Sequence, residues 1–376
     1  MRGIYLDYNA STPIAPEVAA AMRPLLTEHF GNPSSGHWAS RGATEALTWA
    51  REQVAALLGA QPTEIVFTSG GSESNNQAIK GVVTRALRER PDRRPHIICS
   101  AVEHPSVARV CAALEGIGAQ LTTVGVDATG RVDPDQVAAA VTDDTVLITV
   151  MHANNEVGTI QPVAAIATLA KQRGILLHSD AAQSMGKVPV LVDDLGVDLL
   201  TVAGHKLYAP KGIGALYVRE GVAIDSLIHG ADHESGRRAG TESVLLAMGL
   251  GAACELARRD PCAAWLRELR DQFWERLRKA FGDRVQLNGH PTERLPNTLN
   301  VSFVGQQSHD LLTRLDGVAA STGSACHAGS RTVSGVLAAM GVADDVALGA
   351  IRFSLGRGND LEQVERVVEW LGEALG

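Results

Sequence analysis

The sequence contains few cysteines, and they form no pattern typical of a site. Only five cysteines occur among 376 residues, at wide spacings and without a C-x-x-C pair. An odd number of widely spaced cysteines argues against a disulfide framework and against a cysteine-rich zinc site. We therefore expect no metal centre. Sparse, unpaired cysteines also fit the reducing interior of a cell.

Long apolar runs are missing as well. No stretch approaches the roughly 20 apolar residues that a membrane-spanning helix needs. The opening segment, MRGIYLDY, does not contain the apolar core of a signal peptide. We expect a soluble, cytoplasmic protein that does not act at a membrane.

The chain has no excess of basic residues. Lys plus Arg is 34 and Asp plus Glu is 42, which gives a net charge of −8. Such a balance offers no basic surface to neutralise phosphates, so we expect no direct binding of nucleic acid. With 45% hydrophobic and 20% charged residues, the composition is that of an ordinary globular protein.

Helix-like and strand-like segments alternate through the first two thirds of the chain. Residues 43–58 and 162–172 have helical apolar spacing. This βαβ alternation predicts an α/β fold with a largely parallel sheet covered by helices on both faces. The strands are expected at 64–68, 96–100, 145–151, 174–179, 197–202 and 214–218.

After about residue 250 the pattern changes to that of a smaller α+β unit. A charged amphipathic helix is expected at 262–281, a strand at 300–303, a Gly/Ser/Cys loop at 321–335 and a last helix from 361. A chain of 376 residues exceeds the usual size of one compact core. We predict a large domain of residues 13–252 and a small domain of residues 1–12 and 253–376.

Polar clusters follow the predicted strands, where parallel α/β sheets bind their ligands. In 68–76 (TSGGSESNN) a glycine turn leads into a helix whose backbone N–H groups can bind an anion, although ordinary Ser/Thr capping explains the pattern too. Asp180 can face a protonated ring nitrogen or cap a helix. Lys206 can form an imine with an aldehyde or be a solvated lysine. Together they supply what a pyridoxal 5'-phosphate site requires.

With these residues in view, the sequence resembles the NifS/IscS-type cysteine desulfurases of the class V aminotransferase group. The resemblance covers nearly the whole chain. Its ordered motifs are 5–13 (YLDYNASTP), 31–35 (GNPSS), 68–76 (TSGGSESNN), 102–105 (VEHP), 154–158 (NNEVG), 180–183 (DAAQ), 204–206 (GHK) with 210–212 (PKG), 238–242 (RAGTE), 323–326 (GSAC) and 351–356 (IRFSLG).

The resemblance implies a fold-type I pyridoxal phosphate enzyme with a mainly parallel seven-stranded sheet. Lys206 would bond covalently to the cofactor, Asp180 would pair with its ring nitrogen, and Gln183 would bond its ring hydroxyl. His104 would stack on the ring and act as an acid or base, unless it is an ordinary core histidine.

The phosphate group would be held by Gly71, Ser72 and His205, and by Thr241 from the partner subunit of a homodimer. Family members often have a hydroxyl two residues before this histidine, whereas this chain has Ala203. One phosphate hydrogen bond is therefore expected to be missing or replaced by water.

Asn155 and Arg352 would bind the substrate, with Asn155 also close to the cofactor. An arginine can hold an α-carboxylate through two hydrogen bonds. A surface ion pair is the alternative for Arg352, but its neighbours Ile351 and Phe353 predict a strand that holds it inward.

Cys326 would be the nucleophile that takes sulfur from L-cysteine as a persulfide, with L-alanine as the other product. It lies in a stretch of small residues, 321–330, and a nucleophile that must meet both substrate and acceptor needs mobility. The other four cysteines lie in apolar or helical contexts and are expected to be structural.

Other functions remain open at the level of sequence. Selenocysteine lyase shares the cofactor site, and His327 after Cys326 resembles that group, whereas Pro105 after His104 resembles the desulfurases. Another pyridoxal phosphate lyase or aminotransferase, or a binding protein with a decayed site, is a further alternative. The sulfur would go to an acceptor protein, and the short end at Gly376 puts an iron–sulfur scaffold in doubt.

Overall fold

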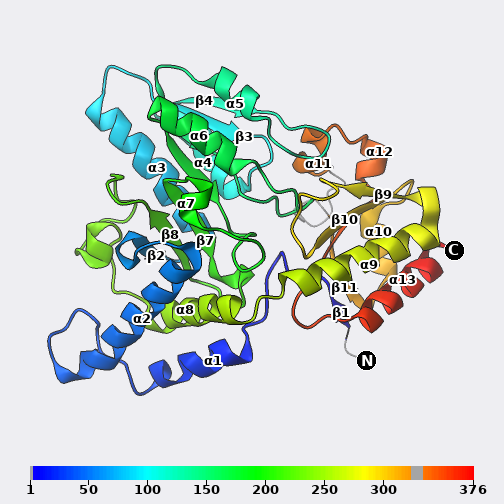
Figure 1. Ribbon diagram of the computed structural model, residues 1–376, viewed down its shortest axis with the longest axis horizontal. Helices are drawn as coiled ribbons and strands as arrows, with labels where there is room; N and C mark the ends of the chain where they lie inside the picture. Colours follow the sequence, from blue (N-terminus) through cyan, green and yellow to red (C-terminus); the bar gives the residue numbers. More distant parts are fainter. Residues whose placement is uncertain (1–2, 323–332) are drawn as a thin grey trace.

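Seven strands form the central sheet of the larger of two cores (Figure 1). The computed structural model describes residues 3–322 and 333–376. Strand β8 runs antiparallel to both of its neighbours, and the other six strands are parallel to one another. In sheet order the strands are β2 (Ile65–Thr68), β8 (Gly214–Val218), β7 (Leu199–Ala203), β6 (Leu176–Asp180), β5 (Thr145–Thr149), β3 (His96–Ser100) and β4 (Gln120–Val124). The expected mainly parallel, seven-stranded sheet is confirmed.

Alternate strand residues point into two apolar layers, one on each face of the sheet. In β2, Ile65 and Phe67 pack in one layer and Val66 in the other. The first layer is covered by α1 (Pro16–Met22), α2 (Arg41–Leu58), α5 (Pro134–Ala140), α6 (Val163–Arg173), α7 (Val192–Leu195) and α8 (Val244–Arg259). The second is covered by α3 (Gly71–Glu89) and α4 (Pro105–Glu115). Burial on both faces explains the nearly continuous apolar strands.

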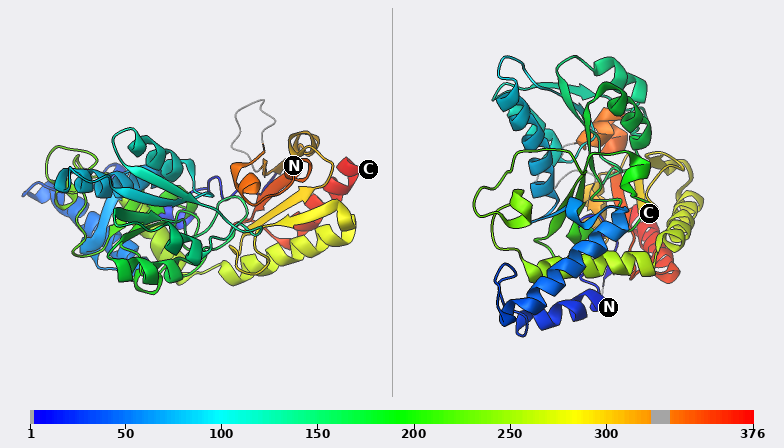
Figure 2. Two further views of the ribbon diagram at one scale, coloured as in Figure 1. Left: turned by 90° about the horizontal axis from the view of Figure 1, so that it is seen from above. Right: turned by 60° about the vertical axis from the view of Figure 1, so that its left-hand side comes forward.

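A second core lies beside the first and contains both ends of the described chain (Figure 2). Its antiparallel sheet has the order β12-β13-β10-β9, and Ile4 of β1 packs with it. The elements are β1 (Ile4–Tyr5), α9 (Ala263–Phe281), β9 (Val285–Asn288), β10 (Thr298–Phe303), α10 (Ser308–Arg314), β11 (Val318–Ala319), β12 (Ser321–Thr322), β13 (Ala350–Ser354) and α13 (Leu361–Leu375). The exact domain limits, 13–252 against the rest, stay a prediction.

A small apolar cluster joins the two cores at one edge. There α11 (Gly335–Ala339) and α12 (Asp344–Ala347) pack Leu337 and Ala347 against Val102 and Met151, which follow strands of the large sheet. The chain after the undescribed residues 323–332 is thereby held next to the carboxyl ends of β3 and β5.

Most expected elements are present, and β4 is the strand of the large sheet that the sequence did not predict. Its residues, QLTTV, are half exposed apart from the last, so the segment has no apolar run. The edge position of β4 explains this composition, because an edge strand packs on one neighbour only. Within the described residues, no helix is both long and apolar enough to cross a membrane.

Candidate active site

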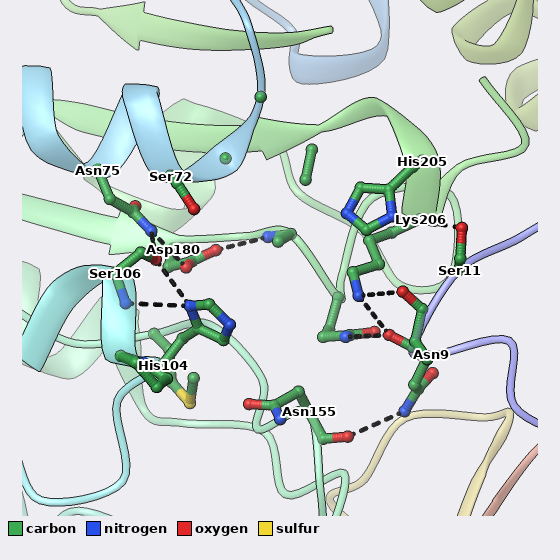
Figure 3. A pocket seen from close by; sticks show the side chains of 18 of the residues that line it. Asn9, Ser11, Ser72, Asn75, His104, Ser106, Asn155, Asp180, His205 and Lys206 are labelled. Atoms are coloured by element: carbon green, nitrogen blue, oxygen red, sulfur yellow. Dashed lines mark hydrogen bonds between the residues drawn. The ribbon is translucent and has the colours of Figure 1, made fainter. Parts of the chain in front are cut away.

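A cavity of about 690 Å³ lies at the carboxyl ends of the parallel strands (Figure 3). Its walls come from the segments after β2, β3, β5, β6 and β7, from residues 9–11 and from β13. This is the edge at which α/β sheets bind ligands, and the volume is typical of small-molecule sites. Nine predicted site residues line the cavity: Gly71, Ser72, His104, Asn155, Asp180, Gln183, His205, Lys206 and Arg352.

Lys206 reaches the cavity from a short turn that directly follows β7. Its Nζ donates to the main-chain oxygens of Asn9 and Ala10, at 2.6 and 2.7 Å. Burial lowers the pKa of Lys206 to about 8, and the positive charge of Arg352 adds to this effect. A lysine with such a pKa is partly neutral near physiological pH, which is the state in which it attacks an aldehyde.

Asp180 ends β6 and is buried at 5% exposure. One carboxylate oxygen accepts the backbone N–H of Ala182 at 2.9 Å, and the other accepts Asn75 Nδ2 at 2.8 Å. The carboxylate thus makes the local backbone bond expected of a cap and also lines the cavity. Each oxygen can accept a further donor, such as a protonated ring nitrogen.

The start of α3 forms the part of the cavity that suits an anion. Gly70 precedes the helix with φ 146°, and no side chain caps the helix there. Ser/Thr capping is therefore not the reason for the TSGGSESNN motif. The N–H groups of Gly71 and Ser72 begin a helix of 19 residues, where backbone donors and the helix dipole favour negative charge.

His205 lies across the cavity from this helix start (Figure 3), with Nδ1 3.4 Å from Ser11 Oγ. Burial lowers the pKa of His205 to about 4, and the nearby charges of Lys206 and Lys211 contribute. A neutral His205 can bond an anion only through a single ring N–H. Ala203, two positions before His205, also lines the cavity, and its side chain is a methyl group that cannot donate a hydrogen bond.

Arg352 projects from β13 into the cavity at 7% exposure, so it is not a surface ion pair. Its Nη2 pairs with Asp7 at 2.7 Å, and its Nη1 donates to the main-chain oxygen of Asn155 at 2.9 Å. Nε is buried without a partner. The guanidinium thus has unused donors, as an arginine that binds a carboxylate requires.

Gln183 and Lys187 form a buried polar group behind Lys206. Lys187 Nζ donates to Gln183 Oε1 at 2.9 Å and to Asn9 Oδ1 at 3.2 Å, and Gln183 Nε2 donates to the Asn9 main-chain oxygen at 3.0 Å. Asn9 therefore connects this pair to Lys206. Lys187 and Asn9 were not singled out from the sequence, and Lys187, which lies in a turn segment between β6 and α7, belongs to none of the polar clusters that follow the predicted strands.

Two other predicted site residues are not among the described residues that line the cavity. Thr241 is exposed and does not line the cavity. Cys326 falls outside the described residues. The described residues on either side of it do reach the cavity: Ser321 lines it, and Ser334 Oγ donates to Glu156, which also lines it. Burial raises the pKa of Glu156 to about 7.

The buried position of Lys187 predicts how stability depends on pH. Burial lowers its pKa from 10.5 to about 7, with Lys206 and Arg352 acting in the same direction. Between these values the unfolded chain binds more protons, so the free energy of unfolding rises as the pH rises above about 7.

Lys187→Met removes this contribution. Relative to the variant, the wild type should gain on the order of 2 kcal/mol in free energy of unfolding between about pH 7 and about pH 9. Urea unfolding of both proteins at both pH values measures it. A difference between the two proteins that does not change with pH contradicts the assignment.

Comparisons with known proteins find the same family over nearly the whole chain. The family model described as aminotransferase class-V matches residues 4–367. A cysteine desulfurase IscS of Dictyoglomus turgidum is 47% identical over 381 residues, covering 98% of this chain and 95% of that protein. A solved structure described as a NifS-like protein has a TM-score of 0.90 at 34% identity and covers 99% of each chain. Another, SspA in complex with cysteine, has a TM-score of 0.82 at 39% identity, covering 94% of this chain and 98% of that one.

Proposed function

The chain belongs to the cysteine desulfurases of the class-V aminotransferase family, and from this premise we propose that it converts L-cysteine to L-alanine and keeps the sulfur as a persulfide on Cys326. The observation that carries the proposal is the meeting of Lys206, Asp180 and Arg352 in one cavity. These groups suit an aldehyde, a ring nitrogen and an amino-acid carboxylate.

The residues present fit pyridoxal 5'-phosphate. The cavity offers a lysine whose pKa is lowered, a buried carboxylate with free lone pairs and an uncapped helix start. We propose that Lys206 bonds to the cofactor, and that Asp180 and Gln183 bond its ring nitrogen and hydroxyl. Gly71, Ser72 and His205 would hold its phosphate. When bound, the cofactor supplies an electron-accepting ring that stabilises negative charge at the substrate α-carbon.

The other residues act on the substrate. Arg352, with Asn155 beside it, would bind the α-carboxylate and so orient the amino group and the α-hydrogen. The paired Asp7 keeps the guanidinium in place. Lys206 Nζ, whose pKa is near 8, can then take up the α-proton and release it again at physiological pH.

Cys326 would carry the sulfur-transfer step. Its thiolate Sγ forms a bond to the substrate sulfur, and the carbon–sulfur bond breaks with its electron pair left on the skeleton that becomes alanine. Cys326 is five positions after Ser321 at the cavity wall, a length of chain that spans up to about 17 Å. This reach supports the role of Cys326.

The active site would be completed by a homodimer, and the sulfur would leave to an acceptor protein. Thr241 is exposed and does not line the cavity of its own chain, which supports the proposal that it binds the phosphate in the cavity of a partner subunit. The acidic net charge argues against nucleic acid as the direct acceptor.

Product analysis tests the proposed activity. The holoenzyme should form L-alanine from L-cysteine, with sulfide released when a thiol reductant is present. L-selenocysteine serves as the comparison substrate, because a selenocysteine lyase would share the cofactor site. Turnover confined to L-selenocysteine would overturn the proposal.

The missing hydroxyl at position 203 predicts an effect on cofactor binding. The Ala203 methyl group lies close to Gly71 at the start of α3, 3.1 Å from where a Cβ on Gly71 would stand. In Ala203→Ser the added hydroxyl can donate to the phosphate, a bond worth about 1 kcal/mol, so the dissociation constant should fall about fivefold. Absorbance titration of the apoprotein with pyridoxal 5'-phosphate measures it. Ala203→Gly adds no donor and serves as the control; equal tightening in both variants contradicts the account.

A further inference from the structure

A chain of hydrogen bonds runs from Asp180 to His104 along the wall of the cavity (Figure 3). Asn75 Nδ2 donates to Asp180 Oδ2 and to Ser106 Oγ, both at 2.8 Å. Ser106 Oγ is in turn 2.7 Å from His104 Nδ1. The four side chains come from β6, α3 and the start of α4, and all of them line the cavity.

The direction of these bonds follows from the carboxylate. An ionised carboxylate only accepts hydrogen bonds, so Asn75 must turn its NH₂ group toward Asp180. The same NH₂ group then donates to Ser106 Oγ. The hydroxyl proton of Ser106 is thereby left to point at His104 Nδ1.

A second donor reaches the same ring nitrogen. The backbone N–H of Ser106 lies 3.1 Å from His104 Nδ1, so the imidazole caps the start of α4. A backbone N–H cannot accept a hydrogen bond. A proton on Nδ1 would therefore point at this N–H, and in the imidazolium form it would also put positive charge at the positive end of the helix dipole.

Nδ1 is consequently an acceptor, and the proton of the neutral ring is on Nε2. Figure 3 shows the other ring nitrogen of His104 turned toward the side of the cavity where Lys206 lies. Desolvation lowers the pKa of His104, Lys206 acts in the same direction and Asp180 opposes it. His205, whose pKa is also lowered, interacts with His104 as well.

We propose that Asn75 and Ser106 are positioning residues that hold His104 neutral with its Nε2–H directed into the cavity. His104 then serves as a hydrogen-bond donor to the substrate and does not carry the α-proton. That task is left to Lys206. The consequence for catalysis rests on the proposed function, whereas the protonation state of His104 does not.

Nitrogen-15 NMR of holoenzyme labelled at its histidines measures the protonation state and the tautomer of His104 directly. The signals of His104, one of twelve histidines, are assigned by their loss in His104→Gln. We expect a single neutral Nε2–H tautomer at neutral and alkaline pH. An Nδ1–H tautomer, or an imidazolium near neutral pH, would overturn the proposal.

Ser106→Ala and Ser106→Thr test the positioning role. Loss of a donor to Nδ1 should raise the pKa of His104 or mix its tautomers, and the threonine hydroxyl should restore the wild-type spectrum. An alanine variant with an unchanged spectrum overturns the role of Ser106. Because no turnover is required, a protein that shows the predicted tautomer but makes no alanine would refute the proposed activity and leave this inference standing.

Discussion

Replacement of Lys206 by alanine should abolish both the covalent attachment of the cofactor and turnover. Lys206 Nζ is the atom proposed to bond to the aldehyde of the cofactor, and the same atom is proposed to move the α-proton. We expect alanine formation from L-cysteine to fall by about 10³-fold or more. The absorbance band of the lysine–cofactor bond should disappear at the same time.

Lys211→Ala is the matched control, because Lys211 lines the same cavity. This variant should keep the absorbance band, since the cofactor remains bonded to Lys206. If the band survives in Lys206→Ala and disappears in Lys211→Ala, the assignment of the two lysines is wrong.

Replacement of Cys326 by alanine should separate sulfur transfer from cofactor binding. The variant keeps Lys206 and Asp180, so its cofactor absorbance should match that of the wild type and should still change when L-cysteine is added. Alanine formation should fall on the order of 10³-fold or more, because no thiolate is left to take the sulfur.

Cys262→Ala provides the control for this prediction. Burial raises the pKa of the Cys262 thiol, and burial raises that of Cys254 to about 12, so neither is a ready nucleophile. The control should keep full activity. Unimpaired alanine formation in Cys326→Ala would instead favour a pyridoxal phosphate lyase or aminotransferase in which this cysteine is incidental.

The sequence predicted the parts of the site that lie at strand ends. Asp180 and Lys206 end or follow β6 and β7, and parallel strands bring their carboxyl ends to one edge. Arg352 was also predicted correctly to point inward, because Ile351 and Phe353 beside it are fully buried. Local pattern predicted where these residues lie, and the resemblance to the family implied their roles.

Contacts between distant residues were beyond such patterns. Arg352 pairs with Asp7 across 345 positions, and Lys187 meets Asn9 across 178. The Asn75 side chain joins Asp180 across 105 positions, although its own motif reads as an ordinary helix start. Tertiary packing, within the large core or between the two cores, decides which of these polar groups meet, so no local pattern marks them.

The most direct test of the central claim is the mass of the protein after a single turnover. Holoenzyme incubated with one equivalent of L-cysteine, without reductant, should gain the mass of one sulfur atom per chain while one L-alanine is released. Peptide mapping should place that sulfur on Cys326. Sulfur on a different cysteine, or alanine formed without any sulfur retained on the protein, would contradict the account.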